Sequence, residues 1–336
     1  MPKWKESASL GPMFDARPYL KELARGGRAA RDLSRDEART LFSAVLADQI
    51  APEALGALAV ALRVKGETAL ELAGMMDALQ SHVRPLEIAV RRAIPVLLPS
   101  YNGARKSPNL VPLLALLLAR EDVPVVLHGM HQDAARVGAF GILEDLGHAR
   151  VTTIAAAEER LRASHIAVME LEVLSPDLAR VLRLRDVTGV RNSGHTMAKL
   201  LLPAGISPAA ACRLVPVTHP EFMKLMREHL AGAAGSAFLM RGVEGEAVAR
   251  LHSPQPLEEF RADGSAMSHL LGDGEAEPML PERDASATAA WTLDVLEGRL
   301  PAPAALARQV ALIVEHCRHA AAAGRPPLRL VSSKAD

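Results

Sequence analysis

The chain has 336 residues, of which 49% are hydrophobic and 23% charged, as is typical of a soluble globular protein with one large domain or two smaller ones. Its 39 lysines and arginines equal its 39 aspartates and glutamates, which argues against a strongly basic nucleic-acid-binding protein but leaves a local basic patch open. The two cysteines exclude a disulfide framework, and no signal peptide or membrane-length apolar run stands out, so we expect a cytoplasmic protein without a membrane partner.

The first 88 residues predict a small helical domain. After an irregular arm over residues 1–18, apolar residues at helical spacing predict four helices, over 19–26, 34–46, 52–62 and 67–79. Ser34 and Glu37 have the spacing of a capping box, in which two side chains satisfy backbone N–H groups at the start of a helix.

From residue 89 onward, short apolar runs alternate with helical segments. Strands are expected over residues 94–98, 123–127, 150–154, 166–170, 212–217 and 236–240, helices over 110–120, 285–296 and 303–323, and a long loop over 261–288. Such alternation favours parallel strands. We therefore predict an α plus α/β fold, with a small N-terminal all-helical domain (1–88) and a larger α/β domain (89–336) around a central, mostly parallel sheet. Residues 175–205 are expected to pack back on the helical domain.

The stretch from Val123 to Gly147, VPVVLHGMHQDAARVGAFGILEDLG, predicts a strand, a tight turn, a loop and a helix closed by glycine. Ligands of α/β proteins bind where such strands end, because a helix N-terminus there offers free N–H groups and a positive dipole. Every strand–helix unit needs a turn of this kind, so the pattern alone leaves a site and a purely structural turn equally open.

Several motifs resemble those of the anthranilate phosphoribosyltransferases. The segment Leu62–Thr68, LRVKGET, resembles part of that family's N-terminal helical domain, and residues 123–147 resemble its VPVAKHGNR segment with the helix that follows. Arg185, Gly189 and Arg191 stand where the family has VRxxLGxRT. The resemblance covers roughly residues 17–325 and implies the two-domain fold of that family.

The same resemblance shows where the chain departs from the family's chemistry, which displaces pyrophosphate from phosphoribosyl pyrophosphate with an aromatic amine. The family implies a GTGGD loop whose N–H groups cradle pyrophosphate and an Asp-Glu pair for magnesium. Here Pro99-Ser-Tyr-Asn-Gly103 stands at the loop, and Ala247 and Val248 stand at the metal pair. Of the family's TFNIS segment only Asn109 remains. These departures imply that the anthranilate reaction has been lost.

The departures resemble those of the diverged YbiB-type group of the family, which is associated with nucleic-acid binding. This resemblance implies sequence-independent binding of the DNA or RNA backbone by a homodimer formed through the helical domain, with no catalytic residue and no cofactor. An active phosphoribosyl- or glycosyltransferase with altered substrates, which would need Mg²⁺, is the alternative. A small-molecule sensor that keeps the pocket without catalysis is a third possibility.

Three groups of side chains are candidates for these functions. The nucleic-acid-binding candidates are Arg183, Arg185, Arg191, His195 and Lys199, which form either a phosphate-contacting patch or an ordinary solvated helix face. The candidates for a diverged phosphate or ligand pocket are Tyr101, Asn102, Gly103, Lys106, Ser107, Asn109, His128, Gly129, His131 and Arg136. Tyr101 could stack on a base or lie in an inert surface loop, and the histidines could act as ligands or simply close their strand. Glu244 and Glu246 are weak candidates for magnesium and otherwise solvated carboxylates in a glycine turn.

Overall fold

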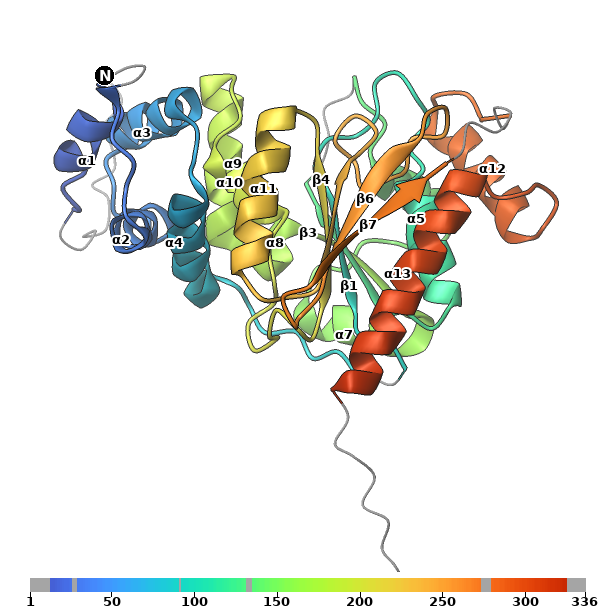
Figure 1. Cartoon of the computed structure of the whole chain (residues 1–336). Coiled ribbons are helices and arrows are strands. Elements are labelled where there is room, and N and C mark those ends of the chain that lie inside the picture. The colour runs from blue at the N-terminus through green and yellow to red at the C-terminus, as the bar shows by residue number, and fades with distance from the viewer. Residues whose placement is uncertain (1–12, 26–28, 91, 131–134, 273–278, 325–336) are drawn as a thin grey trace, which may run out of the picture.

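The N-terminal part of the molecule is a helical domain (Figure 1). The computed structural model describes residues 13–25, 29–90, 92–130, 135–272 and 279–324. The helices of this domain are α1 (Arg17–Leu23), α2 (Arg35–Leu46), α3 (Pro52–Lys65) and α4 (Ala69–Leu79), followed by the short 3-10 helix η2 (Gln80–His82). The predicted capping box is confirmed at α2, where Ser34 accepts from the N–H of Glu37 and Glu37 accepts from the N–H of Ser34.

In the described part of the chain after residue 90, seven strands form one sheet in the order β3-β2-β1-β4-β5-β6-β7. The strands are β1 (Val96–Ser100), β2 (Val125–Gly129), β3 (Ile166–Glu170), β4 (Cys212–Val217), β5 (Ala237–Arg241), β6 (Gln255–Phe260) and β7 (Ala266–Leu271). Strands β1 to β5 are parallel, whereas β6 and β7 are antiparallel to their neighbours. The prediction of a helical domain followed by an α/β domain with a mostly parallel sheet is therefore confirmed.

Helices cover both faces of the sheet, and alternate residues of each strand face the two sides. In β1, Val96 and Leu98 belong to one hydrophobic core and Leu97 to the other. The core of Val96 and Leu98 is closed by α5 (Val111–Arg120), α6 (Ala139–Asp145), α12 (Ala285–Leu296) and α13 (Ala304–Ala323). The core of Leu97 continues into the helical domain through α7 (Ile154–Ser164), α8 (Leu171–Leu174), α9 (Pro176–Thr188), α10 (Ser193–Ala198) and α11 (Pro220–Gly232).

Helices α9 and α10 lie against the helical domain although they are far from it in sequence. On α9, the Arg180 guanidinium pairs with the Asp48 carboxylate at 2.7 Å and donates to the carbonyl oxygen of Val45 at 2.8 Å. On α10, the Ser193 hydroxyl donates to the Glu67 carboxylate at 2.5 Å. Both helices thus join the two domains.

Two expected elements differ from the structure. Residues 150–154 do not form a strand, because only Val151 makes an isolated bridge, to Met169, before α7 begins at Ile154. The long loop expected over 261–288 is wrong as well, since β7 occupies residues 266–271 and pairs with β6.

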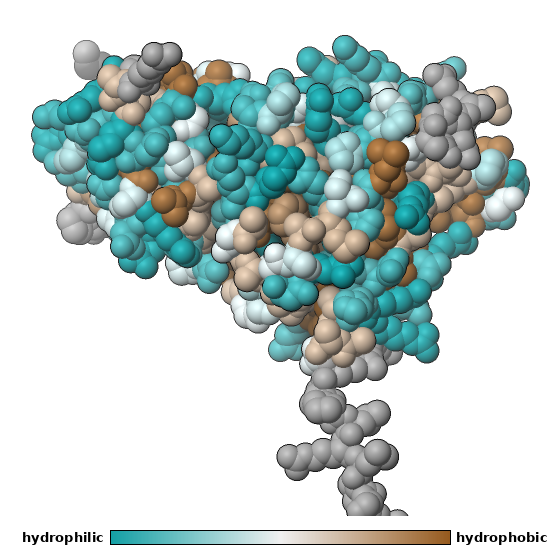
Figure 2. Space-filling view, in the orientation of Figure 1, coloured by the Kyte–Doolittle hydropathy of each residue, from teal (hydrophilic) through white to brown (hydrophobic). Residues whose placement is uncertain are grey.

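No helix in the described parts of the chain is both long enough and apolar enough to cross a membrane. Hydrophilic residues predominate on the face seen in Figure 2, with hydrophobic ones in small groups.

Candidate functional site

The carboxyl ends of β1 and β5 lie at the same edge of the sheet, because both strands run parallel to β4 between them. The loop after β1, residues 101–110, there contacts the turn after β5, residues 242–248. The first is the loop that resembles the family's phosphate cradle, and the second is the turn that resembles its metal pair. The two departures from the family's motifs are therefore in direct contact.

Glu246 is buried at this contact, with 3% of its surface exposed. Its Oε1 accepts hydrogen bonds from the backbone N–H of Asn102 at 2.7 Å and of Gly103 at 2.8 Å. The Asn102 amide in turn donates to the carbonyl oxygen of Gly245 at 2.6 Å. Gly245 has φ +88°, and a Cβ there would lie 2.1 Å from the Asn102 Nδ2 atom, so the turn needs glycine. Burial raises the pKa of Glu246, although these N–H donors oppose the shift.

Glu244 binds the same loop farther along. Its carboxylate accepts from the N–H groups of Arg105 at 2.8 Å, Lys106 at 2.9 Å and Ser107 at 3.1 Å. Partial burial acts to raise the pKa of Glu244, but the three N–H donors outweigh it and lower the pKa below its usual value. The side chain therefore stays ionised at neutral pH and holds the loop as an anion would.

Five N–H groups of the 101–110 loop thus donate to two carboxylates of the same chain. A phosphate bound there would have to displace both carboxylates or lie against their negative charge. Both Glu244 oxygens and the Oε1 atom of Glu246 already accept from N–H donors of the loop, whereas Glu246 Oε2 has no hydrogen-bond partner among the described residues. Among the described residues, no group of three or more His, Cys, Asp or Glu side chains could hold a metal ion.

Tyr101, the first residue of the loop, forms a buried pair with His128 of β2. The Tyr101 hydroxyl and the His128 Nδ1 atom are 2.8 Å apart, and the rings meet edge to face. Burial lowers the pKa of His128 to about 3 and raises that of Tyr101 well above its usual value, so both are neutral at pH 7. The interpretation of Tyr101 as a base-stacking residue or part of an inert surface loop is wrong, because the ring is enclosed by protein.

Other residues proposed for the diverged pocket mainly shape the loop. The Asn109 side chain accepts from the N–H of Val111 and donates to the carbonyl oxygen of Val137, which fixes the start of α5. Gly129 is needed for packing, since a Cβ there would lie 2.1 Å from the carbonyl oxygen of Ser100. The Lys106 side chain is exposed, and His131 lies outside the described residues.

Four arginines gather above this loop at the boundary between the two domains: Arg63, Arg136, Arg185 and Arg191, here called the boundary arginines. Arg191 donates to the side-chain oxygen of Asn102, and Arg136 donates to the carbonyl oxygens of Asn102 at 2.9 Å and of Gly103 at 3.3 Å. Burial lowers the pKa of Arg191 to about 10, with further lowering by Arg185 and Arg136. Arg63, on α3, lies 5.9 Å from the ring centre of Phe222 on α11.

The predicted nucleic-acid patch is split by the structure. His195 is buried and Lys199 is half-buried. Burial lowers the pKa of His195 to about 3 and that of Lys199 to about 8, and Lys199 donates to the carbonyl oxygen of Pro216 at 2.7 Å. Neither can serve as a surface phosphate contact, which corrects that part of the prediction. Arg183 is exposed but forms an ion pair with Glu172. Only Arg185 and Arg191 of the five join the boundary arginines.

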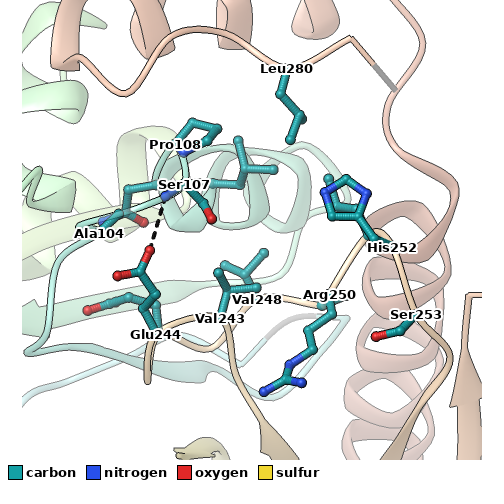
Figure 3. Close-up of a pocket in the computed structure, with 15 residues that line it drawn as sticks. Ala104, Ser107, Pro108, Val243, Glu244, Val248, Arg250, His252, Ser253 and Leu280 are labelled. Carbon is teal, nitrogen blue, oxygen red and sulfur yellow. Dashed lines mark hydrogen bonds between the residues drawn. The ribbon is translucent and has the colours of Figure 1, made fainter. Parts of the chain in front are cut away.

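A pocket of about 290 Å³ opens beside the two carboxylates (Figure 3). Ser107, Pro108 and Leu280 border it, and Glu244 and His252 lie on opposite sides of it. Most of the remaining lining is apolar. Its charged lining comprises the carboxylates of Glu244 and Glu246 and the guanidinium of Arg250, so it offers no excess of positive charge for a phosphate.

Sequence reasoning missed Arg63 and the binding of the loop by Glu244 and Glu246. Arg63 lies within LRVKGET, the segment that matches the family most closely, so the motif itself marked its position. The carboxylate contacts join residues about 140 positions apart, and no local pattern encodes them.

Comparison with known proteins agrees with this description. Residues 17–83 match the helical bundle domain of a glycosyl transferase family. The structure is similar to anthranilate phosphoribosyltransferase from Thermus thermophilus, with a TM-score of 0.69 and 25% identity over 90% of this chain and 89% of that one. It also shares the fold of the Saccharomyces cerevisiae enzyme in complex with PRPP and Mg, with a TM-score of 0.65 and 15% identity over 92% and 89% of the two chains. The chain belongs to the anthranilate phosphoribosyltransferase-like family of glycosyltransferases.

Within this family, the chain is 36% identical to the uncharacterized protein YbiB of Escherichia coli strain K12 over 299 residues, which are 89% of this chain and 93% of YbiB. It is 31% identical to the anthranilate phosphoribosyltransferase of Saccharopolyspora erythraea over 218 residues, 65% of this chain and 60% of that enzyme. The sequence identity to YbiB is thus higher and extends over more of both chains. The resemblance to the YbiB-type group that the motifs indicated is therefore confirmed.

Proposed function

We propose that this protein binds the phosphate backbone of DNA or RNA without reading base sequence, through the boundary arginines. The observation that carries the proposal is the crowding of Arg136, Arg185 and Arg191; burial lowers the pKa of Arg191, and the charges of Arg185 and Arg136 lower it further. None of these three forms an ion pair with a described carboxylate; Arg136 and Arg191 donate only to neutral oxygens of the loop. A polyanion would relieve their mutual repulsion and release its own counterions.

The state of the old phosphate loop supports the same proposal. Since Glu244 and Glu246 take up the loop's N–H groups, the loop presents carboxylates where a pyrophosphate donor would need donors. The boundary arginines remain as the source of positive charge beside the loop. A protein altered in this way still attracts a nucleic-acid backbone, but it opposes the tight binding of a single pyrophosphate.

Assembly and location form part of the proposal. We expect a homodimer through the helical domain, where Val60 and Val64 on α3 are 44% and 74% exposed. These residues are one helical turn apart and therefore share a face. A reducing compartment such as the cytoplasm suits the two free cysteines, both of which are buried.

The test is a binding titration with single- and double-stranded oligonucleotides over a salt series. The wild-type affinity should fall steeply with salt, and Arg63→Gln with Arg185→Gln should lower the slope of log K against log salt by about two, since each phosphate contact contributes about 0.9. Arg183→Gln is the matched control, because Arg183 lies on the same helix as Arg185 but pairs with Glu172. No binding at physiological salt, or equal effects of the control and the double variant, would refute the proposal.

A second candidate is an active phosphoribosyl- or glycosyltransferase with altered substrates and Mg²⁺ as cofactor. The pocket of about 290 Å³ beside the loop favours it, because its size suits a small molecule. The two carboxylates on its wall oppose an anionic donor. If this function holds, phosphoribosyl pyrophosphate with magnesium should raise the melting temperature of the wild-type protein, because a ligand that binds only the folded state stabilises it.

A further inference from the structure

Arg213 is a buried arginine at the opposite edge of the sheet from the candidate site. It is the second residue of β4, near the amino end of that strand, and only 3% of its surface is exposed. Neither its Nε atom nor its Nη2 atom has a hydrogen-bond acceptor among the described residues. Buried guanidinium groups in proteins are normally paired with an anion or fully hydrogen-bonded, so this side chain needs explaining.

No carboxylate of the described residues forms an ion pair with Arg213; the two that line the same pocket, Asp77 and Glu228, face Arg35 and Lys224. The nearby His229, on α11, is buried, and burial together with the charge of Arg213 lowers its pKa to about 4, so the imidazole is neutral at pH 7. Burial lowers the pKa of Arg213 to about 10, which leaves it protonated at neutral pH. The hydroxyl of Ser236, whose carbonyl oxygen accepts from the Arg213 N–H, also has no partner among the described side chains and backbone groups.

Arg213 lines a pocket of about 460 Å³ between the two domains. The walls come from α4 of the helical domain, from α11 and from the segment 200–208, and they include the apolar side chains of Ala73, Met76 and Ile206. Two carboxylates, Asp77 and Glu228, also line it. Asp77 is paired with Arg35 at 2.6 Å, and Glu228 lies 3.9 Å from Lys224.

We propose that this pocket binds a small monocarboxylic acid with an apolar or aromatic body, whose carboxylate pairs with the Arg213 guanidinium. One buried cation matches one anionic group, and the apolar walls match a hydrocarbon body. Arg35 also lines the pocket, but Asp77 pairs with it, so Arg213 is the one unpaired cation among the described lining residues, and a molecule with several negative charges would find too few partners there. The proposal uses none of the residues assigned to nucleic-acid binding, so either proposal can fail without the other.

The experiment is a calorimetric and thermal-shift titration of the full chain with benzoate and hexanoate, using benzamide and hexanamide as neutral analogues of the same shape. We expect a saturable rise in melting temperature with at least one carboxylate and none with its amide. Arg213→Met should weaken carboxylate binding roughly tenfold or more, because it removes a charge-assisted hydrogen bond. Arg250→Met is the matched control: Arg250 lines the pocket of Figure 3, and its loss should leave the affinity unchanged.

A second variant keeps the test decisive if Arg213→Met does not fold. Ala73→Phe adds a ring to the pocket wall from the partly exposed side of α4, so it should abolish carboxylate binding while the salt-dependent binding of oligonucleotides is unchanged. The proposal is overturned if neither carboxylate gives a saturable shift, or if the amides act equally well. It is also overturned if carboxylate affinity survives Ala73→Phe, or if pyrophosphate binds and is lost in Arg213→Met.

Discussion

Glu246 and Glu244 act on the 101–110 loop as internal hydrogen-bond acceptors. In a loop that binds a ligand's phosphate, the N–H groups donate to the ligand, whereas here they donate to two side chains from the turn after β5. The loop is consequently held in one shape by side chains of the same protein.

Glu246→Ala should show how much this contact stabilises the fold. The substitution leaves the buried N–H groups of Asn102 and Gly103 without an acceptor, so the free energy of unfolding should fall by roughly 2–4 kcal/mol. Glu246→Gln keeps an acceptor oxygen and has no charge to desolvate, so it should lose clearly less. Urea denaturation of the three proteins measures both values, and an alanine variant as stable as wild type would contradict this role.

The helices and the parallel strands were largely predictable because their signals are local. Ser34 and Glu37 mark the start of α2, and the apolar runs of β1, β2 and β4 are buried on both faces as expected for central strands. Strand β7 was missed because most of its residues are exposed at the edge of the sheet, so no apolar alternation marks it. The strand expected over residues 150–154 was wrong for the opposite reason. Val151 is apolar, but it makes only an isolated bridge and does not continue into a ladder.

The candidate site was only partly predictable from sequence. The family motifs led to the right loops and to Arg185 and Arg191, because those motifs are contiguous in sequence. The burial of His195 and Tyr101 and the contact of Lys199 with Pro216 were not predictable, since they depend on how α10 and β1 pack against elements far away in the chain. A basic residue in a sequence shows its charge and not its exposure.

Helix α3 carries the prediction about assembly. If Val60 and Val64 form the dimer contact, Val60→Glu with Val64→Glu should convert the protein to a monomer, because two carboxylates would be buried without partners. Val187→Glu is the control, since Val187 is 90% exposed on α9 and lies outside this face. Light scattering after size-exclusion chromatography measures the mass. A monomeric wild type, or a dimeric double variant, would rule out this interface.

The molecule as a whole should be sensitive to mild acid. Burial lowers the pKa of His128 and His195 to about 3 and that of His229 to about 4, from the ordinary value of 6.5. Between these values and pH 6.5, the unfolded chain binds more protons than the folded one, so stability is complete above pH 6.5 and declines as pH falls toward 4. Urea denaturation from about pH 7.5 to about pH 4.5 should show this decline.

A variant separates this histidine effect from other acid-dependent groups. His229→Gln removes one titrating imidazole, so its stability should fall less steeply than that of wild type over the same pH range, by up to about 1.4 kcal/mol per pH unit. Parallel curves for the two proteins, or a wild-type stability that is constant between about pH 7 and about pH 5, would show that the buried histidines do not govern acid stability.

The return of α9 and α10 to the helical domain also sets an order of events during synthesis. Helices α1 to α4 are translated before α9 and α10. Asp48 and Glu67 of the helical domain nevertheless have their partners, Arg180 and Ser193, on these later helices. The apolar surface that these later helices cover must therefore wait until a large part of the parallel sheet has left the exit tunnel. The helical domain is thus completed only after residue 198 has been translated, and part of its apolar surface stays uncovered for that interval.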